Sequence, residues 1–108
     1  MRALSIRQPY VELILRGIKR IEYRSRATKI IGERFYLYVA RKPGDPEGFA
    51  VLDCEPGDLP RGLIVGTATI TRCTRNNGHY EWHLADVKRL KRPRKPKGQP
   101  QPVWFRPF

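Results

Sequence analysis

Three charged side chains, Lys19, Glu22 and Arg24, follow closely on a glycine that ends a short apolar segment. Gly17 marks the predicted end of a helix, because glycine is favoured just past the last helical turn. On an extended segment residues 22 and 24 share a face, and Lys19 can turn toward them from the helix end. We expect Glu22 to stay charged between the two cations, and Arg24 to offer a planar fork for a phosphate or a carboxylate. The same cluster also fits a salt-bridge network that only fixes the junction between helix and strand.

Two polar residues, Ser5 and Gln8, flank the predicted start of this helix. A helix N-terminus presents free backbone N–H groups and a favourable dipole to an anion, so both are candidate ligand-binding residues. A local hydrogen bond within its strand is the alternative for Ser5. Lys42, just after a strand signal at residues 35–40, is a candidate cation at the rim of a cleft. Solvation on a loop is the alternative for this lysine.

Aromatic and polar side chains alternate over residues 79–83. Tyr80 and Trp82 fall on one face of a predicted strand, where they suit stacking of nucleobases, and packing into a core is the alternative for both. The two histidines and Cys73 match no tetrahedral metal-ligand spacing, so we predict no metal site. No motif of P-loop, serine-hydrolase or zinc-protease type is present, and no cofactor is predicted.

A strongly basic segment spans residues 88–97, with seven cations in ten residues and no acid. Pro93 and Pro96 prevent a continuous helix here. We predict an extended, exposed ribbon that can lie along a phosphate backbone, and a disordered solvated loop is the alternative. The cations proposed to contact a nucleic-acid backbone are Lys88, Arg89, Lys91, Arg92, Arg94, Lys95 and Lys97.

The whole chain is also basic. It has 108 residues, with 22 Lys and Arg against 10 Asp and Glu, which gives a formal net charge of +12. The two halves carry equal numbers of cations, so the basicity is not confined to one tail. This balance favours a phosphate-bearing partner, RNA or another nucleic acid, over a merely solubilising surface or a membrane surface.

No apolar run approaches the roughly 20 residues that span a bilayer. Arg7, Gln8 and Glu12 interrupt any signal-peptide core at the N-terminus. We therefore expect a cytoplasmic protein with no membrane partner, in which Cys54 and Cys73 stay reduced.

The elements expected from periodicity and turn residues describe one domain over residues 1–108. They are a strand at 2–6, a helix at 9–16, an extended segment at 20–24, a strand at 35–40, a long connection at 42–62 with one or two helical turns at 46–52, strands at 63–74 and 80–84, a further strand or extension at 87–90, and a last strand at 103–105 that closes the sheet. This pattern predicts an α+β fold, mainly β. We expect a small β-barrel of five or six strands with the helix packed near one end, because closure removes exposed edges.

The chain resembles the ASCH domain family, whose fold is related to the PUA barrel. Residues 3–10 look like the family's strand-to-helix opening, and residues 17–24 match its G-x-K-x-x-E-x-R pattern at all four fixed positions. Residues 80–87, together with 97–99 and Trp104, are similar to its closing segments. The resemblance implies an RNA-associated or coactivator-type module with a cleft between helix and barrel.

The resemblance also implies an enzyme as an alternative, because some members of this family are small amidohydrolases that act on acetylated cytidine and a ribonuclease activity is known among its relatives. The amidohydrolases use a Lys and a Thr in the second motif. Lys19 stands at the Lys position here, whereas Glu22 takes the place of the Thr nucleophile.

Three hypotheses therefore stand side by side. The first is a nucleic-acid-binding module, most simply for RNA, with a nucleotide held in the Lys19–Glu22–Arg24 cleft. The second is an enzyme acting on RNA or a modified nucleoside, with Lys19 as general base or electrostatic stabiliser and Glu22 as its acid–base partner. The third is a protein-interaction module whose segment 88–97 docks an acidic partner.

Overall fold

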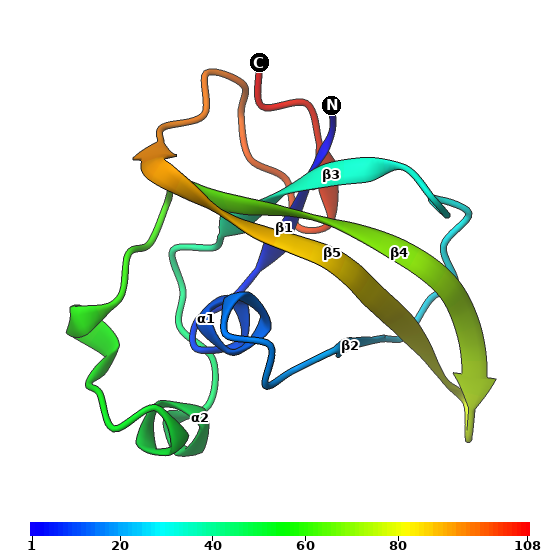
Figure 1. Cartoon of the computed structure of the whole chain (residues 1–108), viewed down its shortest axis with the longest axis horizontal. Helices are drawn as coiled ribbons and strands as arrows, with labels where there is room; N and C mark the ends of the chain where they lie inside the picture. Colours follow the sequence, from blue (N-terminus) through cyan, green and yellow to red (C-terminus); the bar gives the residue numbers. More distant parts are fainter.

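A computed structural model describes all residues from 1 to 108, as a six-stranded mixed sheet with two short α-helices (Figure 1). The elements in chain order are β1 (Ala3–Ile6), α1 (Tyr10–Leu15), β2 (Ile21–Arg24), β3 (Arg34–Val39), α2 (Pro46–Val51), a 3₁₀ turn (Pro56–Asp58), β4 (Ile64–Asn76), β5 (His79–Arg94) and β6 (Trp104–Phe105). The positions predicted from the sequence are confirmed within a few residues. The two segments predicted at 80–84 and 87–90 form one continuous strand. Neither helix is long and apolar enough to cross a membrane.

The strands are ordered β2-β5-β4-β3-β1-β6, and β1 and β3 form the parallel pair. Strands β4 and β5 make a long antiparallel hairpin, which runs across the whole molecule in Figure 1. Its turn places Asn77 at φ 49° and Gly78 at φ 81°, the left-handed conformations that a two-residue hairpin turn requires. The residues Asn77 and Gly78 suit this turn, because asparagine tolerates the left-handed conformation and glycine adopts it without steric cost.

The predicted closed barrel is wrong, because the sheet is open and ends at β2 on one side and β6 on the other. The last strand does not close the sheet, since β6 pairs with β1 alone and has only two residues. Side chains rather than backbone ladders bridge the gap. Trp82 of β5 stacks on Trp104 of β6 with ring centroids 5.9 Å apart. The guanidinium of Arg24 in β2 donates to the carbonyl oxygen of Ser5 in β1, at 2.9 Å.

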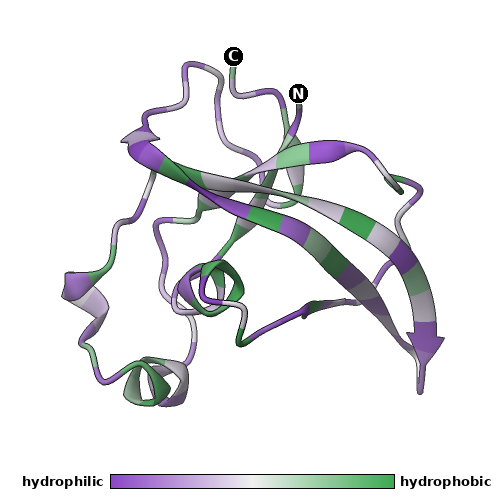
Figure 2. Ribbon diagram, in the orientation of Figure 1, coloured by the Kyte–Doolittle hydropathy of each residue, from purple (hydrophilic) through white to green (hydrophobic).

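The hydrophobic core lies between the concave face of this curved sheet and α1. The alternation of apolar and polar residues along β4 and β5 is visible in Figure 2 and places every second side chain inside. The main cluster of buried residues is Leu4, Ile6, Val11, Ile14, Phe35, Leu37, Val39, Val65, Ala68, Ile70, Trp82 and Leu84. Burial of this apolar surface supplies the main driving force for the fold.

Helix α1 approaches the sheet closely at one glycine. A Cβ added to Gly66 of β4 would lie 2.6 Å from the carbonyl oxygen of Lys88 and 2.7 Å from Cδ2 of Leu15. Both neighbours are held in place, one as strand backbone and the other as part of the packed helix. Gly66 therefore sets how near α1 can lie to the sheet.

Gly66→Ala is expected to lower the free energy of unfolding by about 1–3 kcal/mol, because the added methyl overpacks this contact. Chemical denaturation with urea measures the effect. Gly57→Ala is the matched control, since a Cβ there meets nothing within 4 Å, and we expect a change within about 0.5 kcal/mol. Equal stability of the two variants would contradict a tight contact at Gly66.

Candidate functional site

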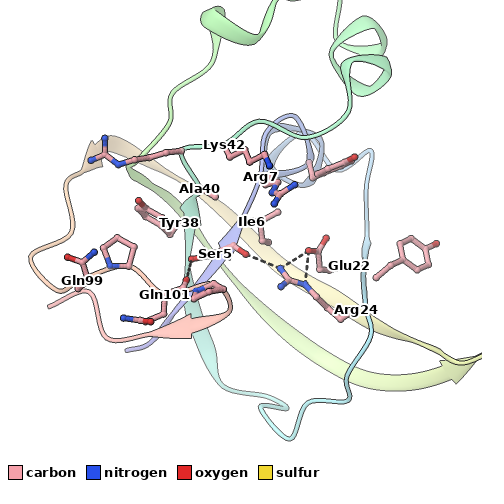
Figure 3. A pocket seen from close by; sticks show the side chains of 15 residues that line it. Ser5, Ile6, Arg7, Glu22, Arg24, Tyr38, Ala40, Lys42, Gln99 and Gln101 are labelled. Carbon is pink, nitrogen blue, oxygen red and sulfur yellow. Dashed lines mark hydrogen bonds and ion pairs between the residues drawn. The ribbon is translucent and has the colours of Figure 1, made fainter.

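A cavity of about 800 Å³ opens where the carboxyl ends of β1 and β3 meet α1, β2 and the segment 99–102. Its charged lining consists of four cations and one carboxylate, namely Arg7, Arg24, Arg41, Lys42 and Glu22. Tyrosines from α1, β2 and β3 and the side chains of Gln99 and Gln101 complete the polar lining. Figure 3 shows Arg7 and Lys42 on one side of this cavity and the two glutamines on the other.

The end of α1 explains how the charged motif reaches the cavity. Gly17 adopts a left-handed φ of 76°, its N–H donates to the carbonyl of Ile14, and the N–H of Ile18 donates to the carbonyl of Leu13. This pair of bonds is the Schellman motif that commonly ends helices. The chain reverses there and passes through Lys19 into β2.

Glu22 and Arg24 form the inner wall of the cavity. Oε2 of Glu22 accepts from Nε of Arg24 at 3.0 Å and pairs with Nη2 at 2.8 Å. Oε1 lies 3.6 Å from Nζ of Lys19. Glu22 is 8% exposed, so this buried carboxylate depends on its two cations. Figure 3 shows Arg24 between Glu22 and the carbonyl of Ser5. The network therefore fixes the junction of β2 with β1 and also faces a cavity.

Lys19 supports this wall without lining the cavity. Its side chain is 17% exposed, and its ammonium lies over the rings of Tyr10 and Tyr23, 5.6 Å and 4.8 Å from their centroids. Cation–π contacts and the Glu22 carboxylate thus keep the ammonium group of Lys19 in place. The three residues of the motif are brought together, but only Glu22 and Arg24 face the open space.

Ser5 and Gln8 have structural partners. Oγ of Ser5 donates to the carbonyl of Gln101 at 2.6 Å, which ties the segment 99–102 to β1 at the edge of the cavity. Gln8 is fully buried and lies outside the cavity. Its Oε1 accepts from the backbone N–H of Glu12 at 3.0 Å, so Gln8 already satisfies one of the amides near the helix start.

Lys42, a candidate from the sequence, is one of the residues that line the cavity, and two further cations accompany it. Arg7 follows β1 directly, and Arg41 precedes Lys42 just after β3. Because β1 and β3 are parallel neighbours, their carboxyl ends share one edge of the sheet. The signal for Arg7 and Arg41 is their place after these two strands, but reading it requires knowledge of the parallel pairing.

Tyr80 and Trp82, the predicted stacking residues, lie outside the cavity. Trp82 is 2% exposed and donates its indole N–H to the carbonyl of Arg26, so no ring face is free for a nucleobase. Tyr80 is half-buried and packs against the core. The aromatic residues of the cavity are instead Tyr10, Tyr23 and Tyr38.

The basic segment 88–97 is extended and exposed, as predicted, and its first seven residues belong to β5. Two of its cations have partners within the chain. Arg89 forms a bidentate pair with Glu12, and the guanidinium of Arg94 lies 3.9 Å from the ring centroid of Phe108. The register Tyr38↔Ile64↔Arg94 places the end of the segment two strands from the cavity, roughly 10 Å away.

Glu12 is a second buried carboxylate, 5% exposed, on α1. Arg89 donates to its two oxygens at 3.0 and 2.8 Å, and Nε of Arg16 donates to Oε2 at 2.7 Å. The hydrogen bonds from Arg89 lower the pKa of Glu12 below its usual 4.5, against the opposing effect of burial, and Arg16 lowers it further. The same hydrogen bonds raise the pKa of Arg89.

The fold and the site define a small α+β domain with a cationic cavity at one edge of an open sheet. The chain contains no group of three or more His, Cys, Asp or Glu side chains that could hold a metal ion.

Comparison with known proteins agrees with this description. The sequence profile of the ASCH domain matches residues 4–100. Activating signal cointegrator 1 of Homo sapiens is 35% identical over 80 residues, which cover 65% of this chain. The chain spans only 14% of the length of that human protein. The chain belongs to the ASCH domain family.

Glu12→Gln is expected to lower the free energy of unfolding at neutral pH by about 1–3 kcal/mol, because the variant loses charge-assisted hydrogen bonds around a buried group. The pKa of Glu12 is lower in the folded state, so its contribution is fully present above the unfolded value near 4.5. That contribution disappears as the pH falls through the lowered folded value.

Denaturation of both proteins across acid and neutral pH measures this difference. The gap between the original chain and the variant should be constant near neutrality and shrink in acid. Glu47→Gln is the control, since Glu47 is exposed on α2 and forms no ion pair. A gap that persists unchanged below the folded pKa of Glu12 would refute the assignment.

Proposed function

We propose that this ASCH domain binds RNA, with a nucleotide in the cavity and the adjoining phosphates on the surrounding cations. The proposal goes beyond family membership and is based on the charge and shape of the site. The family resemblance supports RNA over other phosphate-bearing ligands.

The observation that carries the proposal is the set of uncommitted cations at the rim. Arg7, Arg41 and Lys42 form no ion pair. The one carboxylate in the lining, Glu22, is already compensated by Arg24 and Lys19. A positive potential therefore remains over the open space, where the phosphate of a nucleotide would release counterions on binding.

The other polar groups of the cavity suit the rest of a nucleotide. Gln99 and Gln101 are exposed side-chain amides on the wall opposite Arg7, and an amide both donates to and accepts from a base edge. The ring of Tyr10 is half-buried at the cavity, with its hydroxyl bonded to Asp45 at 3.1 Å. A fixed tyrosine is a suitable surface for stacking of a base.

The basic segment 88–97 extends the surface beyond the cavity. The last cations of this segment in β5 lie two strands from the carboxyl end of β3. Arg61 adds a cation next to the rim, because its guanidinium donates to the carbonyl of Arg41 at 3.2 Å. A strand of RNA whose nucleotide occupies the cavity can continue over these side chains. Arg89 contributes less than its neighbours, because its guanidinium is held by Glu12.

Combined substitution of Arg7, Arg41 and Lys42 by Gln is expected to weaken binding of a fluorescently labelled single-stranded RNA by at least about tenfold at low salt. The salt dependence should also decrease, by about 0.7 in log–log slope for each RNA phosphate that the variant no longer neutralises. Fluorescence anisotropy over a series of salt concentrations measures both quantities.

The matched control replaces Lys29, Arg72 and Arg75 by Gln, which removes the same charge from exposed positions outside the cavity. Only a small change in affinity is expected for this variant. If both triple variants lose affinity equally, binding is a general charge effect and the cavity has no part in it. Affinity independent of salt in the original chain would contradict the proposal altogether.

The name of the human relative, Activating signal cointegrator 1, supports a second candidate, a protein-interaction module. The exposed segment 88–97 would then dock an acidic protein surface. This candidate predicts a complex with an acidic protein that survives nuclease treatment and dissociates when Lys91, Arg92 and Lys95 are replaced by Gln. RNA recovered from the untreated complex, with no protein retained after nuclease, would exclude it.

A further inference from the structure

A second, smaller cavity lies at the other end of the hairpin, away from the basic segment. It has a volume of about 360 Å³ and is lined by Tyr23, Asn76, Asn77, His79 and Glu81. Tyr23 borders this groove and also the larger cavity. A bound RNA strand that leaves the larger cavity along β2 would therefore reach the groove next.

The side chain of Tyr23 is an exposed aromatic group at the groove. Nζ of Lys19 lies 4.8 Å from the ring centroid, at a cation–π distance. The residue is nevertheless 59% exposed, in contrast to Tyr38, which is 3% exposed. A largely exposed aromatic ring that also contacts a cation is a platform for stacking of a nucleobase.

Glu81 stands directly opposite Tyr23 in the β2–β5 pair, so the two side chains share a face of the sheet. Its Oε1 accepts from Oγ1 of Thr74 and its Oε2 from Nδ2 of Asn76, both at 3.3 Å. Glu81 forms no ion pair, although the chain has more than twice as many cations as acids. These two neutral donors orient the carboxylate and leave each oxygen an unused lone pair beside the groove.

The chemistry of these groups selects among the bases. A carboxylate only accepts hydrogen bonds, so it recognises a base edge that donates. The Watson–Crick edge of guanine presents two parallel N–H donors, N1–H and N2–H, at the spacing of the two carboxylate oxygens. Uracil presents a single N–H between two carbonyl oxygens, which a carboxylate repels. We propose that the groove is a guanine subsite, with the base stacked on Tyr23 and bonded through N1–H and N2–H to Glu81.

This inference rests on the proposed function, since it assigns a base preference to the RNA bound next to the larger cavity. Asn77 and His79, at the turn of the hairpin, supply donors to the ribose or phosphate of the same nucleotide. The larger cavity and the groove would then hold neighbouring nucleotides on either side of Tyr23.

The test uses two free nucleotides and the full chain. Guanosine 5′-monophosphate and inosine 5′-monophosphate share their phosphate and ring system, but inosine lacks the 2-amino group. Titration of each into the ¹⁵N-labelled protein, followed by NMR, measures affinity at the backbone amides of residues 76–81. We expect guanosine monophosphate to bind about tenfold more tightly there, as for one well-placed bidentate contact.

Four variants, one of them a control, locate the preference. Glu81→Gln should abolish the difference between the two nucleotides, because an amide cannot accept from both donors. Tyr23→Leu should weaken both nucleotides, whereas Tyr23→Phe should retain binding through its ring. Glu47→Gln, with the same change of charge on distant α2, should leave the preference intact, and thermal melting checks that each variant is folded.

Equal binding of the two nucleotides by the original chain would overturn the guanine subsite, as would a preference that survives Glu81→Gln. Shifts confined to the larger cavity would overturn it as well. Salt-dependent RNA binding together with any of these results leaves the proposed function standing. A preference for guanosine monophosphate in a protein that binds no RNA would support the guanine subsite and contradict the proposed function.

Discussion

The contact of Arg24 with Glu22 and the carbonyl of Ser5 holds together the part of the structure on which the site depends. The sheet is open, and β2 has no backbone bonds to β1 or β6 across the gap. One guanidinium spans that gap, with its charge matched by a carboxylate that is itself 8% exposed. Because an uncompensated buried carboxylate is costly, Glu22 is tied to Arg24 and Lys19. The cavity lies beside a gap that is bridged by side chains rather than by a backbone ladder.

A similar arrangement appears at Glu12 of α1, which pairs with Arg16 and Arg89. Two buried carboxylates thus take up four cations from a surface that is rich in them. This division separates cations that support the fold from cations that remain for a ligand. For this reason the seven basic residues of the segment 88–97 are not equivalent. The three rim cations of the cavity are a small share of the 22 in the chain, but they are free to contact a ligand.

Much of the fold could be predicted from the sequence. Helix α1 follows from the spacing of Val11, Ile14 and Leu15 and from Gly17, and the hairpin turn follows from Asn77 and Gly78. These signals are local, so they need no knowledge of the rest of the chain. The prediction of a closed barrel was wrong because closure depends on which strands are neighbours. A two-residue β6 that pairs only with β1 leaves no sign of its edge position in composition.

The candidate site was predictable to the same extent. The motif of Lys19, Glu22 and Arg24 comes from one segment, and the structure does bring the three residues together. Arg7 and Arg41 could not be predicted because they are 34 positions apart and meet only through the parallel pairing of β1 and β3. Alternation along a strand places Trp82 on one of two faces but does not show which face is buried. Both base stacking and core packing are therefore open for Trp82 from the sequence. The burial of that face against Trp104 decides the matter.

Strand β5 has a geometric consequence of its own, because one uninterrupted strand carries Glu81 near its start and the cations of the basic segment near its end. At about 3.3 Å per residue, the separation of these two regions is on the order of 30 Å, comparable with the longest dimension of the molecule. The length of β5 therefore fixes the distance between these two regions. A ligand that touches both ends must reach about as far as nine base pairs of a duplex, at the 3.4 Å rise of each step. Under the proposed function, an oligonucleotide shorter than this span would contact only one end at a time, and its length would then affect its affinity.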